Sequence, residues 1–358
     1  VTGNPATRPP CQSSMSQILF TSSVQPRGPK SMDQPAPSSE AGGGSKAAVS
    51  FRDMPAAKHD PVVWGPPEAI ADVTYNCTVV RGVPRNPQFV EEKLDSLIDT
   101  FETRDDDVFI CTYAKSGTTW TQQIIHLLLN NGEQREQTYS HTIPWLEAAV
   151  GAPGILNDRE APGWSTESIA QNPGRRFFKT HATLRHLPAG KAPGVKVVYV
   201  ARNPKDVCVS LHHHSRDKPE FGYSGEFEHS LQRFVEGGFE GGSWFSHVQE
   251  WWAAAHADPS HVLFMLYEDM MAAPAESVSR LAAFLGLEAP QELVDKVVDA
   301  SSIGAMKANS KANHLAGLNH LRAGGSGRWR EVFTVGQSER FDEVYAKVLD
   351  GFRAQAEA

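Results

Sequence analysis

The turn "AKSGTTW" carries several side chains that can bind an anion, and it lies between an apolar segment and a segment with helical periodicity. Unpaired N–H groups and the helix dipole make a helix N-terminus a position that stabilises negative charge. Gly117 allows close approach of the backbone, and Lys115 adds a full positive charge. Ser116, Thr118 and Thr119 add hydroxyl donors. The turn therefore predicts a phosphate cradle; a cluster of N-cap residues on an ordinary helix is the alternative.

The order of residues in this turn differs from the common nucleotide-binding loop. A Walker A loop, G-x-x-x-x-G-K-[ST], has its lysine after the second glycine, whereas Lys115 precedes the only glycine of the turn. No acidic pair suited to magnesium accompanies the turn. The positive charge that faces the phosphates should therefore come from side chains. Three segments contain suitable basic residues: "FFKTH", "YVARNPKDVCVS" and "HLRAGGSGRW".

Alternating strands and helices must position these segments. The pattern of "KLDSLIDTF" predicts a helix, and four short apolar runs predict strands, each followed by a helical pattern: "DVFICTY", "RRFFKTH", "VKVVYVA" and "HVLFMLY". The helix after "VKVVYVA" is expected to begin with Asn203 as N-cap, Pro204 in its first position and Asp206 in its first turn. We predict a single α/β domain with a central, mostly parallel sheet flanked by helices. Ligands then bind beyond the carboxyl ends of the strands.

Composition limits the classes of partner. The chain has 358 residues, of which 40% are hydrophobic, and a formal net charge of −8, which argues against nucleic acid or an anionic membrane as the main partner. No apolar run approaches the roughly 18 residues that suggest a membrane span. The cysteines are far apart, without metal-like spacing; this indicates a reducing, cytoplasmic compartment rather than a disulfide framework or a structural metal. They are Cys11, Cys77, Cys111 and Cys208.

The first part of the chain differs from the rest. Residues 1–60 are rich in Ser, Pro, Gly and Ala without sustained periodicity, which predicts a disordered or leader segment. A transit peptide that directs the protein to an organelle, a disordered tail and a mistranslated leader are all compatible with this composition. The regular pattern begins only after this segment.

The motifs together resemble those of the cytosolic sulfotransferases. "YAKSGTTW" is similar to their 5′-phosphosulfate loop, Y-P-K-S-G-T-T-W, with Ala114 in place of the proline. "YVARNPKDVCVS" resembles their 3′-phosphate motif, and "FKTH" resembles the segment that carries their catalytic histidine. The match covers about residues 85–355, the predicted sulfotransferase domain, and continues in the expected order through "IPWLE", "GSWFSHVQEWW", "YEDM", "SSIGAMKAN", "RAGGSGRW" and "FTVGQSERFDEVYAKVL".

The resemblance implies a reaction and its catalytic residues. The sulfuryl group of 3′-phosphoadenosine 5′-phosphosulfate (PAPS) would pass to a hydroxyl or amine of a small, apolar or aromatic acceptor, without a metal. His181 is the implied general base, since the pKa of imidazole lies near working pH. Lys115 is implied at the bridging oxygen and Lys179 at the sulfuryl oxygens, where charge develops. A structural histidine and solvated surface lysines are the alternatives.

The resemblance also implies a set of binding residues. Arg202 and Ser210 would bind the 3′-phosphate, and Trp120 would stack on adenine. Trp145, with Lys179 and His181, would contact the acceptor. The residues implied in donor binding are Lys115, Ser116, Gly117, Thr118, Thr119, Trp120, Arg202, Ser210, Tyr267, Ser301, Ser302, Ile303, Met306, Arg322, Ala323 and Gly324.

Three further positions depart from the family pattern. Where the family has R-K-G-x-x-G-D-W, this chain has "RAGGSGRW", with Ala323 in place of lysine and Arg328 in place of aspartate. Ile303 stands where a phenylalanine commonly sandwiches the adenine. Loss of one phosphate-directed charge and of one stacking surface can weaken donor binding. None of these changes affects His181 or Lys115.

The remaining motifs give further expectations. "REVFTVGQSE" resembles the family's dimerisation motif, which predicts a homodimer through Arg330 to Glu339. The triplet "HHH" at 212–214 is not expected to bind a metal, because successive helical residues point about 100° apart. Trp145 and the aromatic residues of "KPEFGYSGEFEHSL" suggest an apolar acceptor pocket. A steroid, a phenol, a fatty alcohol and a polyketide all remain open as acceptors.

Two other functions remain open at this point. A different nucleotide-dependent transferase or kinase on a related scaffold would bind ATP and require magnesium, which the missing Walker A loop opposes. A non-catalytic nucleotide-binding relative would be favoured if the "FKTH" residues were absent, and they are present.

Overall fold

The computed structural model describes residues 62–66, 68–71, 73–151, 155–188, 192–313, 321 and 324–356. The predicted leader, residues 1–60, lies outside them, as do Arg322 and Ala323. The described elements are α2 (Glu68–Ala71), β1 (Thr78–Val80), β2 (Val83–Arg85), α3 (Glu91–Thr100), β3 (Val108–Thr112), α4 (Thr118–Leu129), α5 (Tyr139–Thr142), α6 (Leu146–Gly151), α7 (Ile155–Glu160), α8 (Thr166–Gln171), β4 (Phe177–Thr180), η2 (Leu184–His186), β5 (Lys196–Ala201), α9 (Pro204–Asp217), η3 (Pro219–Phe221), α10 (Phe227–Val235), α11 (Trp244–Ala257), β6 (Val262–Leu266), α12 (Tyr267–Ala272), α13 (Pro274–Leu285), α14 (Gln291–Ser301), α15 (Ile303–Ala308), η5 (Arg328–Glu331) and α16 (Val335–Ala356).

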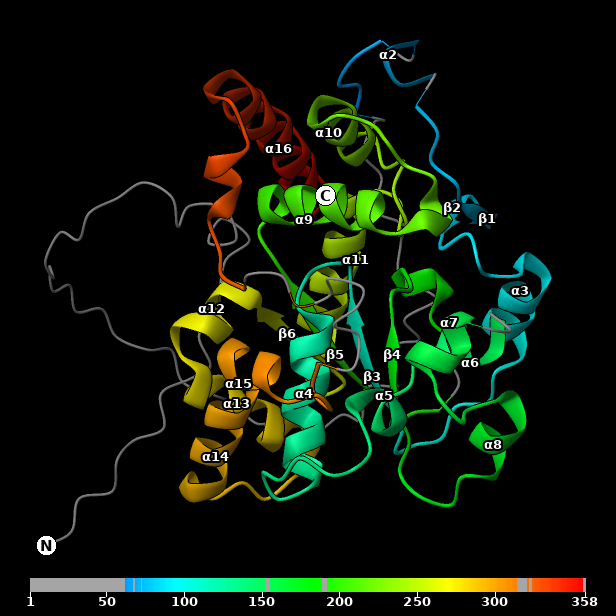
Figure 1. Cartoon of the computed structure of the whole chain (residues 1–358), viewed down its shortest axis with the longest axis vertical. Coiled ribbons are helices and arrows are strands. Elements are labelled where there is room, and N and C mark those ends of the chain that lie inside the picture. Colours follow the sequence, from blue (N-terminus) through cyan, green and yellow to red (C-terminus); the bar gives the residue numbers. More distant parts are fainter. Residues whose placement is uncertain are drawn as a thin grey trace, which may run out of the picture. The chain divides into compact units, whose positions relative to one another are not determined.

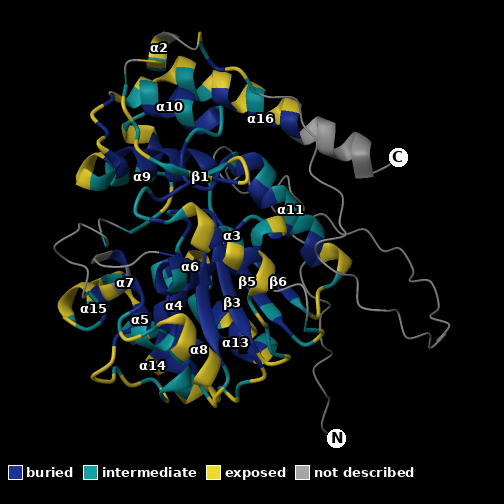
Figure 2. Cartoon of the chain, turned by 90° about the vertical axis from the view of Figure 1, so that its right-hand side faces the viewer, coloured by how far each residue is buried: buried dark blue, intermediate teal, exposed yellow. Residues whose placement is uncertain are grey.

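The central sheet has four parallel strands in the order β4-β3-β5-β6, with helices around it (Figure 1). All four are the strands predicted from the apolar runs, so the predicted fold class is confirmed. Val108 of β3 pairs with Phe177 of β4 and with Lys196 of β5, which fixes the register of the three strands. The strands lie in the buried interior, drawn dark blue in Figure 2.

Side chains alternate between the two faces of this sheet. On one face, Ile110, Val198 and Met265 belong to a core cluster that includes residues of α4, α13 and α14. On the other face, the ring of Tyr199 stacks on Trp251 of α11 with centroids 5.5 Å apart. Helices cover both faces, which explains why "VKVVYVA" is apolar almost throughout.

The carboxyl ends of the strands lead directly into the predicted functional segments. The chain passes from β3 through Lys115 and Gly117 into α4, and it passes from β4 into His181. From β5 it passes through Arg202 into α9. Asn203 caps α9 as predicted, because its side chain accepts a hydrogen bond from the N–H of Lys205 at 3.0 Å. Parallel strands bring these junctions together at one edge of the sheet.

Residues before the predicted domain boundary at 85 also belong to the compact unit, which extends from Ala48 to Ala358. The indole of Trp64 is 2% exposed. Its Nε1 donates to Glu228 of α10 at 3.1 Å, and the guanidinium of Arg340 in α16 lies 4.3 Å from its ring centroid. Across the described part of the chain, no helix combines the length and the apolar character needed to cross a membrane.

Candidate active site

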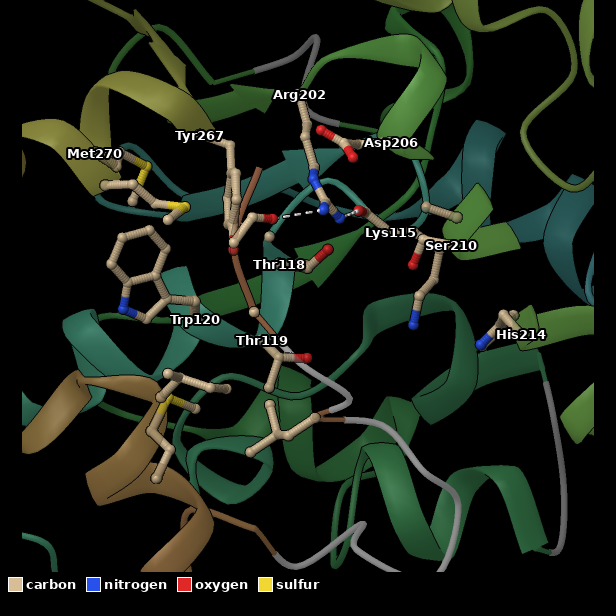
Figure 3. Close-up of a pocket in the computed structure, with 18 of the residues that line it drawn as sticks. Lys115, Thr118, Thr119, Trp120, Arg202, Asp206, Ser210, His214, Tyr267 and Met270 are labelled. Carbon is tan, nitrogen blue, oxygen red and sulfur yellow. Dashed lines mark hydrogen bonds between the residues drawn. The ribbon is translucent and has the colours of Figure 1, made fainter. Parts of the chain in front are cut away.

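A cavity of about 490 Å³ lies at the carboxyl ends of the strands and brings most of the predicted site residues together (Figure 3). Ser116 is buried and does not line it, and Arg322 and Ala323 lie outside the described residues. The predicted residues that line the cavity are Lys115, Gly117, Thr118, Thr119, Trp120, Trp145, Lys179, His181, Arg202, Ser210, Tyr267, Ser301, Ser302, Ile303, Met306 and Gly324.

The turn before α4 has the backbone shape of an anion cradle. Lys115 has φ +69° and Gly117, the N-cap of α4, has φ +103°, so both lie in the left-handed region. A Cβ at position 117 would lie 2.7 Å from Cδ2 of Tyr267, which explains why glycine is required here. Ser116 Oγ is buried and has no hydrogen-bond partner among the described residues. An unpaired hydroxyl beside the free N–H groups of a helix N-terminus suits a phosphate-like anion.

Arg202 connects the cradle with the C-terminal loop. Its Nη1 donates to the carbonyl oxygen of Lys115 and its Nη2 to that of Gly325, each at 3.0 Å, as the dashed lines in Figure 3 show. Its buried Nε has no hydrogen-bond partner within the described part of the chain. Asp206 holds the same loop by accepting from the N–H of Trp329 at 3.1 Å. Arg202 therefore keeps one donor unused, and it lines the same cavity as Ser210.

Aromatic and apolar side chains form the opposite part of the cavity. Trp120 and Tyr267 meet edge to face with centroids 5.5 Å apart, and Figure 3 shows them beside Met270. Ile303 lines the same part but is 40% exposed, so it supplies little of the surface that an aromatic ring would provide. An adenine-sized ring can therefore contact Trp120 and Tyr267 on this side.

His181 has a defined tautomer. Its Nδ1 lies 2.9 Å from the carbonyl oxygen of Thr112, which can only accept a hydrogen bond, so Nδ1 carries the proton. Its Nε2 has no hydrogen-bond partner among the residues described, and the ring lines the cavity. Burial, and then the charge of Lys179, lowers the pKa of His181 to about 3. The imidazole is therefore neutral near pH 7, with its basic nitrogen free to accept a proton.

The backbone of His181 is also fixed. Glu147, in the predicted motif "IPWLE", accepts from the hydroxyl of Thr180 at 2.6 Å and from the N–H of His181 at 3.3 Å. Nη1 of the buried Arg85 donates to the carbonyl oxygen of His181 at 2.9 Å. These contacts hold the ring at the end of β4.

Lys179 is paired in a way that the sequence did not predict. Its ammonium donates to Glu160 Oε2 at 2.8 Å and lies 4.2 Å from the ring centroid of Trp145. Both charged side chains are almost fully buried. Their pairing offsets the cost of burying either charge alone.

Lys115 has a strongly perturbed pKa. Burial, with the charges of Lys218, Arg202 and Lys179 and against that of Glu240, lowers this pKa to about 7. A nearby anion would restore its ordinary proton affinity. The fraction of Lys115 that is a neutral amine near pH 7 therefore gains a proton when a negatively charged group enters the cavity.

Several charged residues of the cavity wall were not predicted as site residues, among them Glu160, Lys218 and Glu240. Lys218 could have been found, since it lies eight positions after Ser210 on one helical face. By contrast, the expectation that the aromatic residues of "KPEFGYSGEFEHSL" line an acceptor pocket is wrong for Phe221. It is fully buried and stacks on Tyr75 at 5.3 Å, away from the cavity wall.

The structure also shows the surroundings of Arg328 and of the histidine triplet. Arg328, which replaces the family's aspartate, pairs with Glu331 at 3.0 Å. In the histidine triplet, Nδ1 of His212 lies 2.7 Å from Ser230 Oγ, whereas His213 and His214 line the cavity. Within the described residues, no group of three His, Cys, Asp or Glu side chains could hold a metal ion.

The chain belongs to the sulfotransferase family. The family model described as Sulfotransferase domain matches residues 105–353, which include the strands and the cavity residues from Lys115 to Arg328. This confirms the predicted family and the class of enzyme, a sulfotransferase.

Individual relatives agree with this assignment. Sulfotransferase 1A1 of the dog (Canis lupus familiaris) is 38% identical over 293 residues, covering 77% of this chain and 95% of the relative. Sulfotransferase 1B1 of the dog is 36% identical, covering 72% of this chain and 88% of the relative. The crystal structure of mouse sulfotransferase SULT7A1 complexed with PAP has a TM-score of 0.64 and 28% identity, and it covers 78% of this chain and 98% of the mouse chain.

Proposed function

We propose that this sulfotransferase transfers the sulfuryl group of PAPS to a hydroxyl group, with His181 as general base. The proposal rests on one observation: the unpaired Nε2 of His181 and the anion cradle at Lys115 face the same cavity. The acceptor hydroxyl gives its proton to Nε2 while its oxygen attacks sulfur. The bond from sulfur to the bridging oxygen breaks, and adenosine 3′,5′-bisphosphate (PAP) leaves.

Lysine side chains supply the positive charge in this mechanism. Lys115 stabilises the bridging oxygen, and Lys179 stabilises the sulfuryl oxygens from its place between Glu160 and Trp145. Glu160 partly offsets the charge of Lys179, so Lys115 provides the larger share of stabilisation.

Transfer of the sulfuryl group from radiolabelled PAPS to a panel of phenols and alcohols, with and without EDTA, tests the reaction. Phosphoryl transfer from ATP that requires magnesium would support the kinase alternative instead.

Arg202 gives a direct test of the donor site. We expect Arg202→Ala to weaken PAP binding by about 10- to 100-fold, since a hydrogen bond to a charged group contributes about 1.5–3 kcal/mol. The affinity for adenosine 5′-phosphate, which lacks the 3′-phosphate, should fall by no more than about threefold. Titration calorimetry with both nucleotides measures the difference.

The control for Arg202 is Arg135→Ala, which removes a solvent-exposed arginine and should leave both affinities unchanged. If Arg202→Ala weakens both nucleotides equally, Arg202 acts through its hydrogen bonds to Lys115 and Gly325 rather than through the 3′-phosphate.

We also propose a homodimer through Arg330 to Glu339. Val335 in this segment is 75% exposed, an unusual position for a large apolar side chain that a partner subunit would cover. We expect Val335→Asp to convert the dimer to a monomer in light scattering, while Val79→Asp, at another exposed valine, leaves the mass unchanged. A wild-type protein that is monomeric at micromolar concentration would contradict this proposal.

A cytoplasmic location is consistent with the cysteine chemistry. Cys77, Cys111 and Cys208 are free thiols, and Cys111 and Cys208 are buried; Cys11 lies outside the described residues. Burial raises the pKa of the thiols of Cys111 and Cys208, which keeps them protonated and unreactive.

A further inference from the structure

One face of α9 extends along the cavity from the predicted 3′-phosphate corner toward His181. Ser210 and His214 line the cavity from this face, and Lys218 caps the helix four residues later. Residues four apart share a helical face, so the eight positions from Ser210 to Lys218 span about 12 Å along the axis. Figure 3 shows Ser210 and His214 on the same side of the cavity as Lys115. Lys218 therefore lies beyond the cradle, toward the acceptor end.

The neighbours of Lys218 place it beside the reacting groups. Among charged groups, the one with the strongest electrostatic effect on Lys218 is Glu160, followed by Glu240. Glu160 is the carboxylate that binds Lys179, two residues before His181. Lys218 in turn has the strongest charge effect on Lys115. Lys218 and His181 line the same cavity, so one ligand in that cavity can contact both.

Lys218 is a buried residue whose ammonium makes no direct ion pair among the described residues. The residue is only 5% exposed, and no ion pair or side-chain hydrogen bond involves it within the part of the chain that the structure describes. Three carboxylates lie near enough to raise its pKa, and each has another partner. Glu160 binds Lys179, Glu240 Oε1 lies 3.6 Å from His214 Nε2, and Glu220 Oε1 lies 3.7 Å from Arg159 Nη2. Burial of an unpaired charge is costly, so an anionic ligand that pairs with it would gain binding energy.

The backbone around Lys218 is rigid. Its carbonyl oxygen accepts from the N–H of Phe221 at 3.2 Å, and the buried ring of Phe221 stacks on Tyr75. The hydroxyl of Tyr75 accepts from the N–H of Glu240 at 3.2 Å. The stacked rings of Phe221 and Tyr75 therefore fix the segments that carry Lys218 and Glu240 relative to each other, as a preorganised binding site requires.

We infer that the acceptor of the proposed reaction carries a carboxylate that Lys218 binds while its hydroxyl group lies at His181. This inference rests on the proposed function and adds the class of acceptor. Glu160, between Lys218 and Lys179, would repel the carboxylate from the hydroxyl position and so orient the acceptor. A hydroxy acid in which a rigid ring or short chain separates the two groups meets this requirement.

A matched pair of phenols tests the inference: 3-(4-hydroxyphenyl)propanoate and its amide, which differ mainly in charge. The wild-type enzyme should favour the acid in kcat/KM by at least about tenfold. Lys218→Met, which keeps the length of the side chain and removes its charge, should reduce the acid-to-amide ratio by about 10- to 100-fold. Lys218→Arg should preserve the preference, as should the control Lys296→Met on the exposed face of α14.

Equal use of acid and amide by the wild-type enzyme, or an unchanged ratio in Lys218→Met, would overturn the inference. If neither phenol is sulfated, calorimetric binding of the two compounds to the PAP complex gives the same comparison, and equal affinities overturn it. Failure of the proposed function has a different signature, because the protein would then bind no PAP and sulfate no acceptor in the panel.

Discussion

His181→Asn is expected to lower sulfuryl transfer to an alcohol by about 10²- to 10⁴-fold, the usual cost of removing a general base. The asparagine amide can still donate to the carbonyl oxygen of Thr112, where His181 donates at 2.9 Å, so local structure should be retained. It has no basic nitrogen in the place of Nε2. Initial rates with PAPS and a simple alcohol measure the loss, and PAP affinity and Tm should remain near wild-type values.

A series of phenols separates a chemical role from a structural one. The residual activity of His181→Asn should rise as the pKa of the acceptor falls, since an ionised phenol needs no base. The control His126→Asn removes a buried histidine that does not line the cavity, and it should keep full activity. Retention of more than about a tenth of the alcohol activity by His181→Asn would refute the mechanism, and a large fall in Tm would favour a structural histidine.

Lys115→Met is expected to lower kcat by about 10²- to 10³-fold, because its charge is needed most as the bond from sulfur to the bridging oxygen breaks. PAP affinity should fall much less. Lys196→Met provides the control, since Lys196 is also partly buried but contacts Phe284 outside the cavity. Equal losses in kcat and in PAP affinity would show that Lys115 contributes uniform binding instead.

The pKa of Lys115 gives this prediction a pH dependence. With a pKa of about 7 in the ligand-free protein, Lys115 loses its proton as the pH rises through neutrality. An anion raises that pKa, so PAP binds with proton uptake, and its affinity falls as the pH increases above about 7. His181, with a pKa of about 3, stays neutral throughout this range, so its titration adds no pH dependence to PAP binding. Calorimetry in buffers of different ionisation enthalpy should detect the proton uptake in wild type and not in Lys115→Met.

Local sequence patterns were sufficient for the fold. Four runs of apolar residues became the four parallel strands, because helices cover both faces of the sheet and leave no polar alternation to obscure the pattern. The start of α9 was predictable from Asn203 and Pro204, since capping depends on neighbouring residues alone. The cradle could be predicted for the same reason, as Lys115 to Trp120 are consecutive residues at one strand-to-helix junction.

The charged residues that surround Lys179 and Lys218 could not be predicted in this way. Glu160 ends α7, Glu240 lies in the loop before α11, and only tertiary packing brings them to Lys179 and Lys218. The aromatic residues after Lys218 misled the sequence interpretation, because an aromatic side chain fills a core as readily as it lines a pocket. The stacking of Phe221 on Tyr75, far away in sequence, decided between these two outcomes.

The hydrogen bond from Nδ1 of His181 goes to a main-chain oxygen, so the tautomer of this ring does not depend on the side chain of Thr112. Every amino acid at position 112 presents the same carbonyl group, so a single nucleotide change there cannot remove the partner that sets the tautomer. Enzymes that orient a histidine with a carboxylate side chain depend on that side chain and lose much of their activity with it. Sequence drift along β3 can therefore alter how well the strand packs without altering which nitrogen of His181 is basic.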